Sequence, residues 1–283
     1  MTQQIKHRPP GIGVDVGATL AKLAVRSKQG ELHLELVDAQ SIDEIEDRIQ
    51  ALPDLPLGLT GCGAPQLAER VSRKSHESLE FEAWGRGSRL LLNRGSKLTD
   101  TPYLLVSLGT GTSMLCVDPE NTARVGGTAL GGGTLLGLGG ALCGAKSHQD
   151  LCKMAQAGDR SEVDLLIRHV YPEGLPTLPP EASASNFGLL ARKARLDKAP
   201  PARTEDLALS VIGLVAENVA LQSCAIAQAH HISHIVYGGS ALLHNPVMQI
   251  LLAGITGSSG HEAILLEDGS HAGAIGALEF ATD

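Results

Sequence analysis

The chain has 283 residues, of which 43% are hydrophobic and only 2% are aromatic, and its formal net charge is −8. This length suffices for two ordinary domains, whose cores aliphatic side chains must fill because aromatic ones are scarce. The acidic balance and the scarcity of stacking aromatics argue against a nucleic-acid-binding protein, although a few glycine loops and one arginine would still bind a small anion.

The first ten residues are polar and end in Pro-Pro. They contain no apolar signal-peptide core, so we expect a loose tail over residues 1–10, a cytoplasmic location and no association with a membrane. The five cysteines are scattered and form no C-x-x-C pair, which favours buried, reduced thiols. His230, His231 and His234 have no acidic or cysteine companion at ligand spacing, so a surface turn is preferred to a metal site.

Residues 11–101 are expected to form an N-terminal domain that opens with three consecutive strands. The predicted elements are strands at 11–16, 20–26, 32–37 and 57–60, and helices at 41–51 and 65–74. A short strand or extended segment is then expected over 78–83, followed by a helix to about residue 93.

A turn between the first two strands carries candidate chemistry in the string Asp15-Val-Gly-Ala-Thr-Leu-Ala-Lys22. Asp15 would end a strand at a cleft, Gly17 to Thr19 would present backbone N–H groups and a hydroxyl, and Lys22 could point back from the next strand. A carboxylate beside phosphates usually holds Mg²⁺, often through water. An ordinary hairpin with an exposed aspartate is the alternative.

The pattern restarts in a C-terminal domain expected over 102–283. The predicted elements are strands at 103–108, 112–117, 122–128, 235–237 and 263–266, and helices at 147–157, 160–169, 185–194, 204–230, 246–253 and 272–280. Its first turn, within Ser107-Leu-Gly-Thr-Gly-Thr112, repeats the strand–turn–strand pattern with glycine and threonine in the turn, about ninety residues after the turn that follows Asp15. Two such halves would face each other across a cleft, and it is left open whether the last helix packs back toward the first domain.

A glycine-rich stretch runs from Arg124 to Gly140 and includes Gly131-Gly-Gly133 before a predicted helix that ends near Gly144. A triple glycine at a helix start allows close approach to a ligand, with bare N–H groups and a partial positive charge that suit a phosphate. The alternatives are a buried glycine-rich helix and a membrane span, for which the stretch is slightly short. A third glycine loop, Gly238-Gly-Ser240, follows a predicted strand.

Taken together, these strings resemble the type II pantothenate kinases, a family of the actin–hexokinase–Hsp70 superfamily. The resemblance covers nearly the whole chain and is carried by Gly11-Ile-Gly-Val-Asp-Val-Gly-Ala-Thr-Leu-Ala-Lys22, Thr60-Gly-Cys-Gly-Ala64, Leu79-Glu-Phe-Glu82, Ser107-Leu-Gly-Thr-Gly-Thr-Ser113, Arg124-Val-Gly-Gly-Thr-Ala-Leu-Gly-Gly-Gly-Thr134, Ala157-Gly-Asp-Arg-Ser-Glu-Val-Asp-Leu165, Ala184-Ser-Asn-Phe-Gly188 and Tyr237-Gly-Gly-Ser240. It implies a two-domain α/β fold, the actin-like ATPase (ribonuclease H-like) fold, with an ATP cleft between the domains.

The resemblance also implies a reaction: ATP-dependent phosphorylation of pantothenate to 4′-phosphopantothenate, the first step of coenzyme A biosynthesis. Glu80 aligns with the catalytic base and Arg124 with the arginine that grips the pantothenate side. ATP and Mg²⁺ are implied as cofactors, with Asp15 beside the metal. The implied nucleotide-binding positions are Asp15, Gly17, Ala18, Thr19, Leu20, Lys22, Ser107, Gly109, Thr110, Gly111, Gly131, Gly132, Gly133, Thr134, His148, Gly239 and Ser240.

Glu82 is the rival base, because on a strand it would face the same side as Glu80; a solvated strand edge is the alternative for both. Three positions depart from the family pattern. Ala18 replaces a glycine and suits the turn only if its φ is negative, Cys62 also stands where glycine is usual, and His148 replaces an aromatic residue near the nucleotide.

Other functions stay open on the same fold. The acceptor could be pantetheine or an N-acetylhexosamine, and a non-catalytic ATP-binding regulator is a further alternative. We also expect a homodimer, because the predicted helix 204–230 has more apolar surface than one domain needs to bury. That surface comprises Val211, Leu214, Val215, Val219 and Ile226, which could instead be the core of the second domain.

Overall fold

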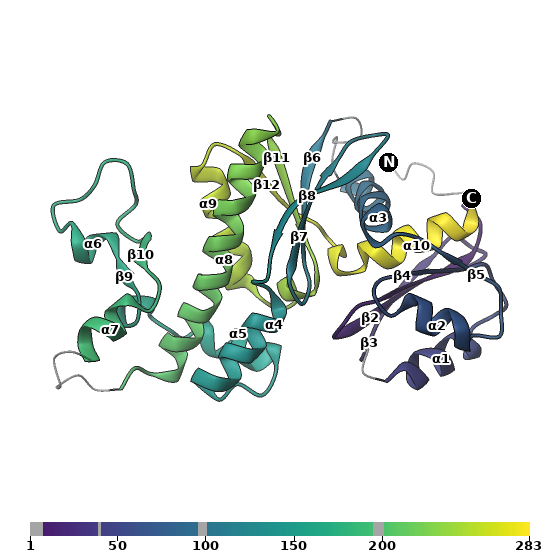
Figure 1. Ribbon diagram of the computed structural model, residues 1–283, viewed down its shortest axis with the longest axis horizontal. Coiled ribbons are helices and arrows are strands. Elements are labelled where there is room, and N and C mark those ends of the chain that lie inside the picture. Colours follow the sequence, from purple (N-terminus) through teal and green to yellow (C-terminus); the bar gives the residue numbers. More distant parts are fainter. Residues whose placement is uncertain (1–7, 39–40, 96–100, 195–200) are drawn as a thin grey trace.

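The computed structural model describes residues 8–38, 41–95, 101–194 and 201–283. Most of the expected tail, residues 1–7, therefore lies outside the described residues. Two five-stranded sheets form the body of the molecule, with the helix α10 (Ala272–Thr282) between them (Figure 1).

The two sheets have the same topology. The first has the order β3-β2-β1-β4-β5 and the second the order β8-β7-β6-β11-β12. The central strands are β1 and β6. Each pairs antiparallel with the strand that follows it in the chain, β2 or β7, and parallel with the strand on its other side, β4 or β11. The strands are β1 (Gly11–Val16), β2 (Leu20–Arg26), β3 (Leu32–Asp38), β4 (Leu57–Thr60), β5 (Ser75–Glu77), β6 (Tyr103–Leu108), β7 (Thr112–Val117), β8 (Thr122–Thr128), β11 (His234–Gly238) and β12 (Glu262–Leu265). The predicted duplication is thus confirmed at the level of topology, and the α/β actin-like architecture with it.

Helices cover both faces of the first sheet. The outer face is covered by α1 (Ile42–Ala51) and α2 (Ala64–Arg70), whose side chains Ile45, Ile49 and Leu67 are fully buried against the strands. The inner face is covered by α10, which lies directly on β1 and β4 because both strands have a glycine there. A Cβ at Gly13 would lie 1.9 Å from the carbonyl oxygen of Ala274. The last helix therefore packs on the sheet formed by the start of the chain.

Helix α3 (Glu80–Gly95) packs beside α10 between the two sheets (Figure 1). The expected strand or extended segment over 78–83 is wrong: the strand β5 ends at Glu77, and the helix begins at Glu80. Two acidic residues, Glu80 and Glu82, occupy its first turn, where carboxylates are favourable because the N-terminal end of a helix carries a partial positive charge.

The outer face of the second sheet is covered by a helical layer. It comprises α4 (Gly132–Leu138), which continues as a π-helical turn (Gly139–Cys143), α5 (His148–Ala155), α8 (Thr204–Ala229) and α9 (Pro246–Ser258). Within α8, Val211, Val215 and Val219 are fully buried in this layer. They belong to the core of their own chain, so they do not supply the surplus apolar face from which a homodimer was expected.

By length and composition α8 could also cross a membrane, and it is the one helix among the described residues that could. In its most apolar 18-residue window 61% of the residues are buried inside the protein, as in the core helix of a globular domain.

Residues 159–194 form an arm beside the first half of α8, on the side away from the two sheets (Figure 1). The arm contains a 3₁₀ turn (Arg160–Glu162), β9 (Leu165–Leu166), α6 (Ile167–Val170), β10 (Ser183–Ser185) and α7 (Gly188–Ala194). The expected helix over 160–169 is therefore wrong. Side chains hold the backbone of the arm instead: the Asp159 carboxylate accepts a hydrogen bond from the Ser161 N–H, and the Asp164 carboxylate accepts one from the Phe187 N–H.

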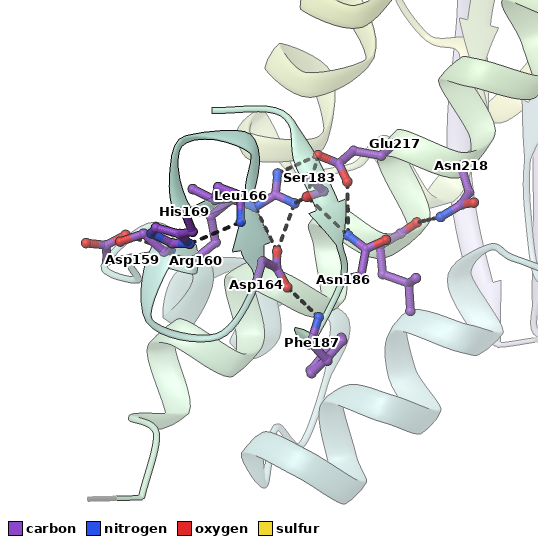
Figure 2. Close-up of polar contacts among 12 residues, drawn as sticks. Asp159, Arg160, Asp164, Leu166, His169, Ser183, Asn186, Phe187, Glu217 and Asn218 are labelled. Atoms are coloured by element: carbon purple, nitrogen blue, oxygen red, sulfur yellow. Dashed lines mark hydrogen bonds and ion pairs between the residues drawn. The ribbon is translucent and has the colours of Figure 1, made fainter. Parts of the chain in front are cut away.

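A polar cluster joins the arm to α8 (Figure 2). The Arg160 guanidinium donates to Asp164 at 2.9 Å and to Glu217 of α8 at 2.8 Å, and Asn186 donates to the other oxygen of Glu217 at 2.9 Å. Asp164 is fully buried, and burial raises the pKa of its carboxyl group although Arg160 opposes the shift. Because Arg160 pairs with both carboxylates, the cluster fixes the arm to the middle of α8.

Candidate active site

A cavity of about 340 Å³ lies where the β1–β2 turn of the first sheet meets the β6–β7 turn of the second. Its walls bring together 13 of the residues expected in the site: Asp15, Gly17, Ala18, Thr19, Leu20, Lys22, Glu80, Ser107, Gly109, Thr110, Gly111, Arg124 and Ser240. The other expected residues, Gly131, Gly132, Gly133, Thr134, His148 and Gly239, do not line it.

Asp15 and Lys22 face each other across the first hairpin. They are register partners on the antiparallel strands β1 and β2, and Lys22 Nζ lies 3.8 Å from Asp15 Oδ2. Both side chains are buried. Burial raises the pKa of the Asp15 carboxyl, while the charge of Lys22 and a hydrogen bond from Trp84 oppose the shift.

The donor set fits Mg²⁺ of the kind found beside nucleotide phosphates. Among the described residues no three or more His, Cys, Asp and Glu side chains gather into a metal site. Mg²⁺ needs no such cage, because it usually keeps several waters and binds one or two carboxylates together with substrate phosphates. Asp15, next to two glycine turns, could provide that carboxylate.

The two turns touch across the cavity. The hydroxyl oxygens of Thr19 and Thr110 lie 3.0 Å apart, and the first turn is closed by a hydrogen bond from the Gly17 N–H to the Leu20 carbonyl. Ala18 is not among the described residues with positive φ, so its Cβ is compatible with the turn.

The triple glycine has a different role from the expected one. The N–H groups of Gly132 and Gly133 are not bare: they donate to the carbonyls of Gly109 and Thr110 at 2.8 and 2.9 Å. A Cβ at Gly131 would lie 2.7 Å from the carbonyl carbon of Gly111. The glycines therefore let the start of α4 dock on the second turn and hold its shape, so they act on the cavity indirectly.

Glu80 enters the cavity from the first turn of α3. The side chain is exposed to the cavity, yet enough protein surrounds its carboxyl group that partial desolvation raises its pKa. The negative charge of Asp15 raises that pKa further, and Lys22 opposes it. A carboxylate with a raised pKa, exposed beside a phosphate-type loop, is suited to accept a proton from a hydroxyl group.

Glu82 does not share that position. Because both residues lie on a helix, side chains two apart point to different sides, and Glu82 instead lines a separate surface pocket with Arg86 and Arg89. The expectation that the two carboxylates face the same side is therefore wrong, and of the two only Glu80 lines the cavity between the turns.

Arg124 reaches the cavity from β8. The pairing of β7 with β8 shifts here: Met114 is opposite Gly126, and Leu115 is opposite Arg124, so Val125 is an extra residue. A bulge of this kind bends a strand and redirects the neighbouring side chain. The Arg124 guanidinium also lies 6.0 Å from the centre of the Phe81 ring, a cation–π distance.

The third glycine loop reaches the cavity through Ser240, while Gly239, at φ 118°, packs on the backbone of Leu108. His148 lies outside the cavity, where its Nε2 is 3.0 Å from the carbonyl oxygen of Leu243. Burial lowers the pKa of His148, which favours the neutral form of the ring.

Sequence reasoning missed five residues of the cavity wall as site residues: Cys62, Trp84, Thr112, Ser113 and Thr128. A signal existed for Trp84. It lies four residues after Glu80, and on a helix this spacing places two side chains on the same face. The wrong assignment of residues 78–83 as extended concealed it.

Known proteins resemble this chain in sequence. The model of the Fumble family matches residues 75–279. The chain is 31% identical over 267 residues to a type II pantothenate kinase of Staphylococcus haemolyticus, covering 94% of this chain and 98% of the relative. It is 33% identical over 268 residues to a type II pantothenate kinase of Staphylococcus aureus, with the same coverage.

Solved structures share the fold at much lower identity. Component A of (R)-2-hydroxyglutaryl-CoA dehydratase from Acidaminococcus fermentans aligns with a TM-score of 0.63 at 18% identity, covering 97% of this chain and 98% of the other. A ROK family glucokinase from Streptomyces griseus, in complex with glucose and AMPPNP, aligns with a TM-score of 0.54 at 15% identity, covering 96% and 98%. These similarities support the architecture of two sheets around a cleft.

Proposed function

The chain belongs to the type II pantothenate kinase family, and on that premise we propose that it transfers the γ-phosphoryl group of ATP to the primary hydroxyl of pantothenate. The product is 4′-phosphopantothenate, and the reaction is the first step of coenzyme A biosynthesis. The observation that carries the proposal is the convergence of Glu80, Arg124, Asp15 and both glycine turns on one cavity.

The mechanism follows from what each group can do at this cavity. The Glu80 carboxylate accepts the proton of the attacking hydroxyl, so that the oxygen can form its bond to the γ-phosphorus as the bond to the β-phosphate oxygen breaks. The Arg124 guanidinium binds the acceptor carboxylate or the transferring phosphoryl group through charge-assisted hydrogen bonds. The turns at Ala18–Thr19 and Gly109–Gly111 offer backbone N–H groups and two threonine hydroxyls to the polyphosphate, while the Gly17 N–H closes the first turn.

Mg²⁺ is part of the proposal, with Asp15 as its carboxylate partner, directly or through water. When bound, the ion neutralises charge on the β- and γ-phosphate oxygens. Lys22 lies beside the same carboxylate and adds a positive charge at the phosphate end of the cavity.

An acceptor screen tests the function. ADP release by the purified chain is measured with pantothenate, pantetheine, N-acetylglucosamine or no acceptor, always with ATP and Mg²⁺. Release that depends on pantothenate supports the proposal. Release only with pantetheine or with the amino sugar would assign a different acceptor, and ATP binding without any acceptor effect would indicate a regulator instead.

We propose a homodimer whose contact surface does not include the buried residues Val211, Val215 and Val219. Apolar side chains remain exposed on α8 and on the arm: Leu221 is 58% exposed, Tyr171 47%, Leu178 46% and Val170 43%. A second copy of the chain would cover them. A light-scattering mass of a single chain at micromolar concentration would refute the dimer.

Two further assignments belong to the proposal. A cytoplasmic location is supported by the cysteines, all five of which are free thiols, as expected in a reducing compartment. We place the domain boundary near residue 101, with α10 returning to the first domain, because α10 packs on α3, β1 and β4.

A further inference from the structure

The Asp15 carboxylate lies in a close-fitting socket. Trp84, 4% exposed on the helix α3, brings its indole nitrogen next to this carboxylate, and its N–H group helps to hold the pKa of Asp15 down against the effect of burial. On one side a Cβ at Gly61 would lie 2.6 Å from Oδ1, and on another a Cβ at Gly273 would lie 2.6 Å from Oδ2 and 2.9 Å from the Trp84 ring nitrogen. The absence of both Cβ atoms is what leaves room for the carboxylate and the indole.

The socket brings together three separate parts of the chain. Gly61 follows β4, Trp84 lies on α3, and Gly273 is in the first turn of α10. The start of α10 also contributes a partial positive charge next to the carboxylate. With Lys22 3.8 Å from Oδ2, the carboxylate is confined on several sides and turned toward the cavity that it lines.

We propose that Trp84 is a positioning residue for the phosphoryl transfer: with Gly61 and Gly273 it fixes the orientation in which Asp15 holds the metal of the metal–nucleotide complex. The inference rests on the proposed function. Groups that orient a metal-binding side chain commonly contribute about 10- to 100-fold to metal affinity or activity, because the ligand no longer has to be ordered when the ion binds.

Trp84 could instead serve only as a core side chain, since it packs in the cluster with Leu91, Tyr103 and Ala274. The two roles have different consequences. A core role requires the ring, which phenylalanine largely supplies, whereas the positioning role requires the N–H group, which phenylalanine lacks. Trp84→Phe therefore separates them, and Gly273→Ala crowds both the carboxylate and the indole nitrogen while keeping the N–H group.

Tyr103→Phe is a matched control. Tyr103 lies in the same core cluster and its hydroxyl is 2.8 Å from the hydroxyl of Ser88, so the variant also loses one buried hydrogen bond. It makes no contact with Asp15 in the socket described above. Its effect measures what a lost buried hydrogen bond alone does to metal binding.

The test measures Mn²⁺ affinity in the presence of a non-hydrolysable ATP analogue, from the electron paramagnetic resonance signal of free Mn²⁺. Trp84→Phe and Gly273→Ala are expected to weaken Mn²⁺ binding by about ten-fold or more, while Tyr103→Phe stays near the wild type. An unchanged Mn²⁺ affinity in a folded Trp84→Phe variant overturns the inference.

A second measurement needs no variant at position 84. Trp84 is the chain's only tryptophan, so the intrinsic tryptophan fluorescence reports the surroundings of its ring in the socket. Adding Mg²⁺ with the ATP analogue is expected to change its emission, and Asp15→Asn to remove that change; an emission that metal saturation leaves unaltered counts against the socket. Neither measurement uses pantothenate, so failure of the acceptor screen and failure of this inference are distinguishable.

Discussion

The hydroxyl oxygens of Thr19 and Thr110 lie 3.0 Å apart and join the two glycine turns of the molecule across the cavity. The two residues come from equivalent hairpins, β1–β2 in the first sheet and β6–β7 in the second. Each turn alone offers backbone N–H groups to one part of a polyphosphate chain. Their contact brings both sets of donors within reach of the same ligand.

Replacing either threonine by valine is expected to raise the KM for ATP, because that variant loses the hydroxyl donor of its turn. The pair is exposed, so its contribution to the free energy of unfolding is at most about 1 kcal/mol. A double-mutant cycle on ATP affinity measures the coupling between Thr19 and Thr110. Strictly additive effects would contradict a functional link between the turns.

Gly131→Ala is expected to raise the KM for ATP and to lower the melting temperature, since the new Cβ would lie 2.7 Å from the backbone of Gly111 and must displace the second turn. Gly137→Ala is the matched control on the same helix, with open space around its Cβ. It is expected to leave activity unchanged and to stabilise the chain slightly, by about 0.4–1 kcal/mol. Equal behaviour of the two variants would refute the docking role of the triple glycine.

Arg160→Met is expected to destabilise the chain by about 3–5 kcal/mol, because it leaves the buried carboxylates Asp164 and Glu217 without their cation. Arg168→Met is the control on the same arm. Its partner Glu181 is 67% exposed, and a pair of this kind contributes little. Urea unfolding of both variants tests the difference; similar midpoints would show that the cluster does not anchor the arm.

The pH dependence of kcat/KM reports the ionisation of the base in the free enzyme. Glu80 accepts a proton only when ionised, so activity falls as pH is lowered through its pKa, which lies above the ordinary 4.5. The fall in activity at low pH is the acid limb of the profile. Since Asp15 also has a raised pKa and interacts with Glu80, the pKa read from this limb describes the two carboxyl groups together. Lys22→Met removes the opposing cation and is expected to move this limb to higher pH.

Lys28→Met, in the turn after β2, is the control for that shift, because it removes a lysine without changing the cavity wall. Its acid limb is expected to coincide with that of the wild type. An acid limb at or below the ordinary pKa of a glutamate, in the wild type, would contradict the assignment of a raised pKa to Glu80.

Much of this architecture could be predicted because its signals are local. The alternation of β1 and β2 and the short turn between them determine which residues are cross-strand partners, so the position of Lys22 opposite Asp15 follows from the hairpin itself. The repeat of this device near Thr110 predicted a second sheet and a cleft.

Other features depended on contacts between distant segments. The sequence 78–83 has no pattern that separates a strand from the start of a helix, and the helical outcome depends on α10 packing against α3. The arm is held by the ion pair between Arg160 and Glu217, which lie 57 residues apart, so the local periodicity of the sequence could not reveal this contact. The hydrogen bonds of Gly132 and Gly133 to the second turn are likewise visible only in the fold.

The most direct test of the account is pantothenate-dependent ADP release by the wild type, Glu80→Gln and Glu82→Gln, assayed side by side with saturating ATP and Mg²⁺. We expect Glu80→Gln to lower kcat by about two to four orders of magnitude, the usual contribution of a general base, with ATP affinity nearly unchanged. Glu82→Gln should stay close to the wild type, because Glu82 lines a different pocket. Near-normal turnover in Glu80→Gln, or no pantothenate-dependent release by the wild type, would contradict the account.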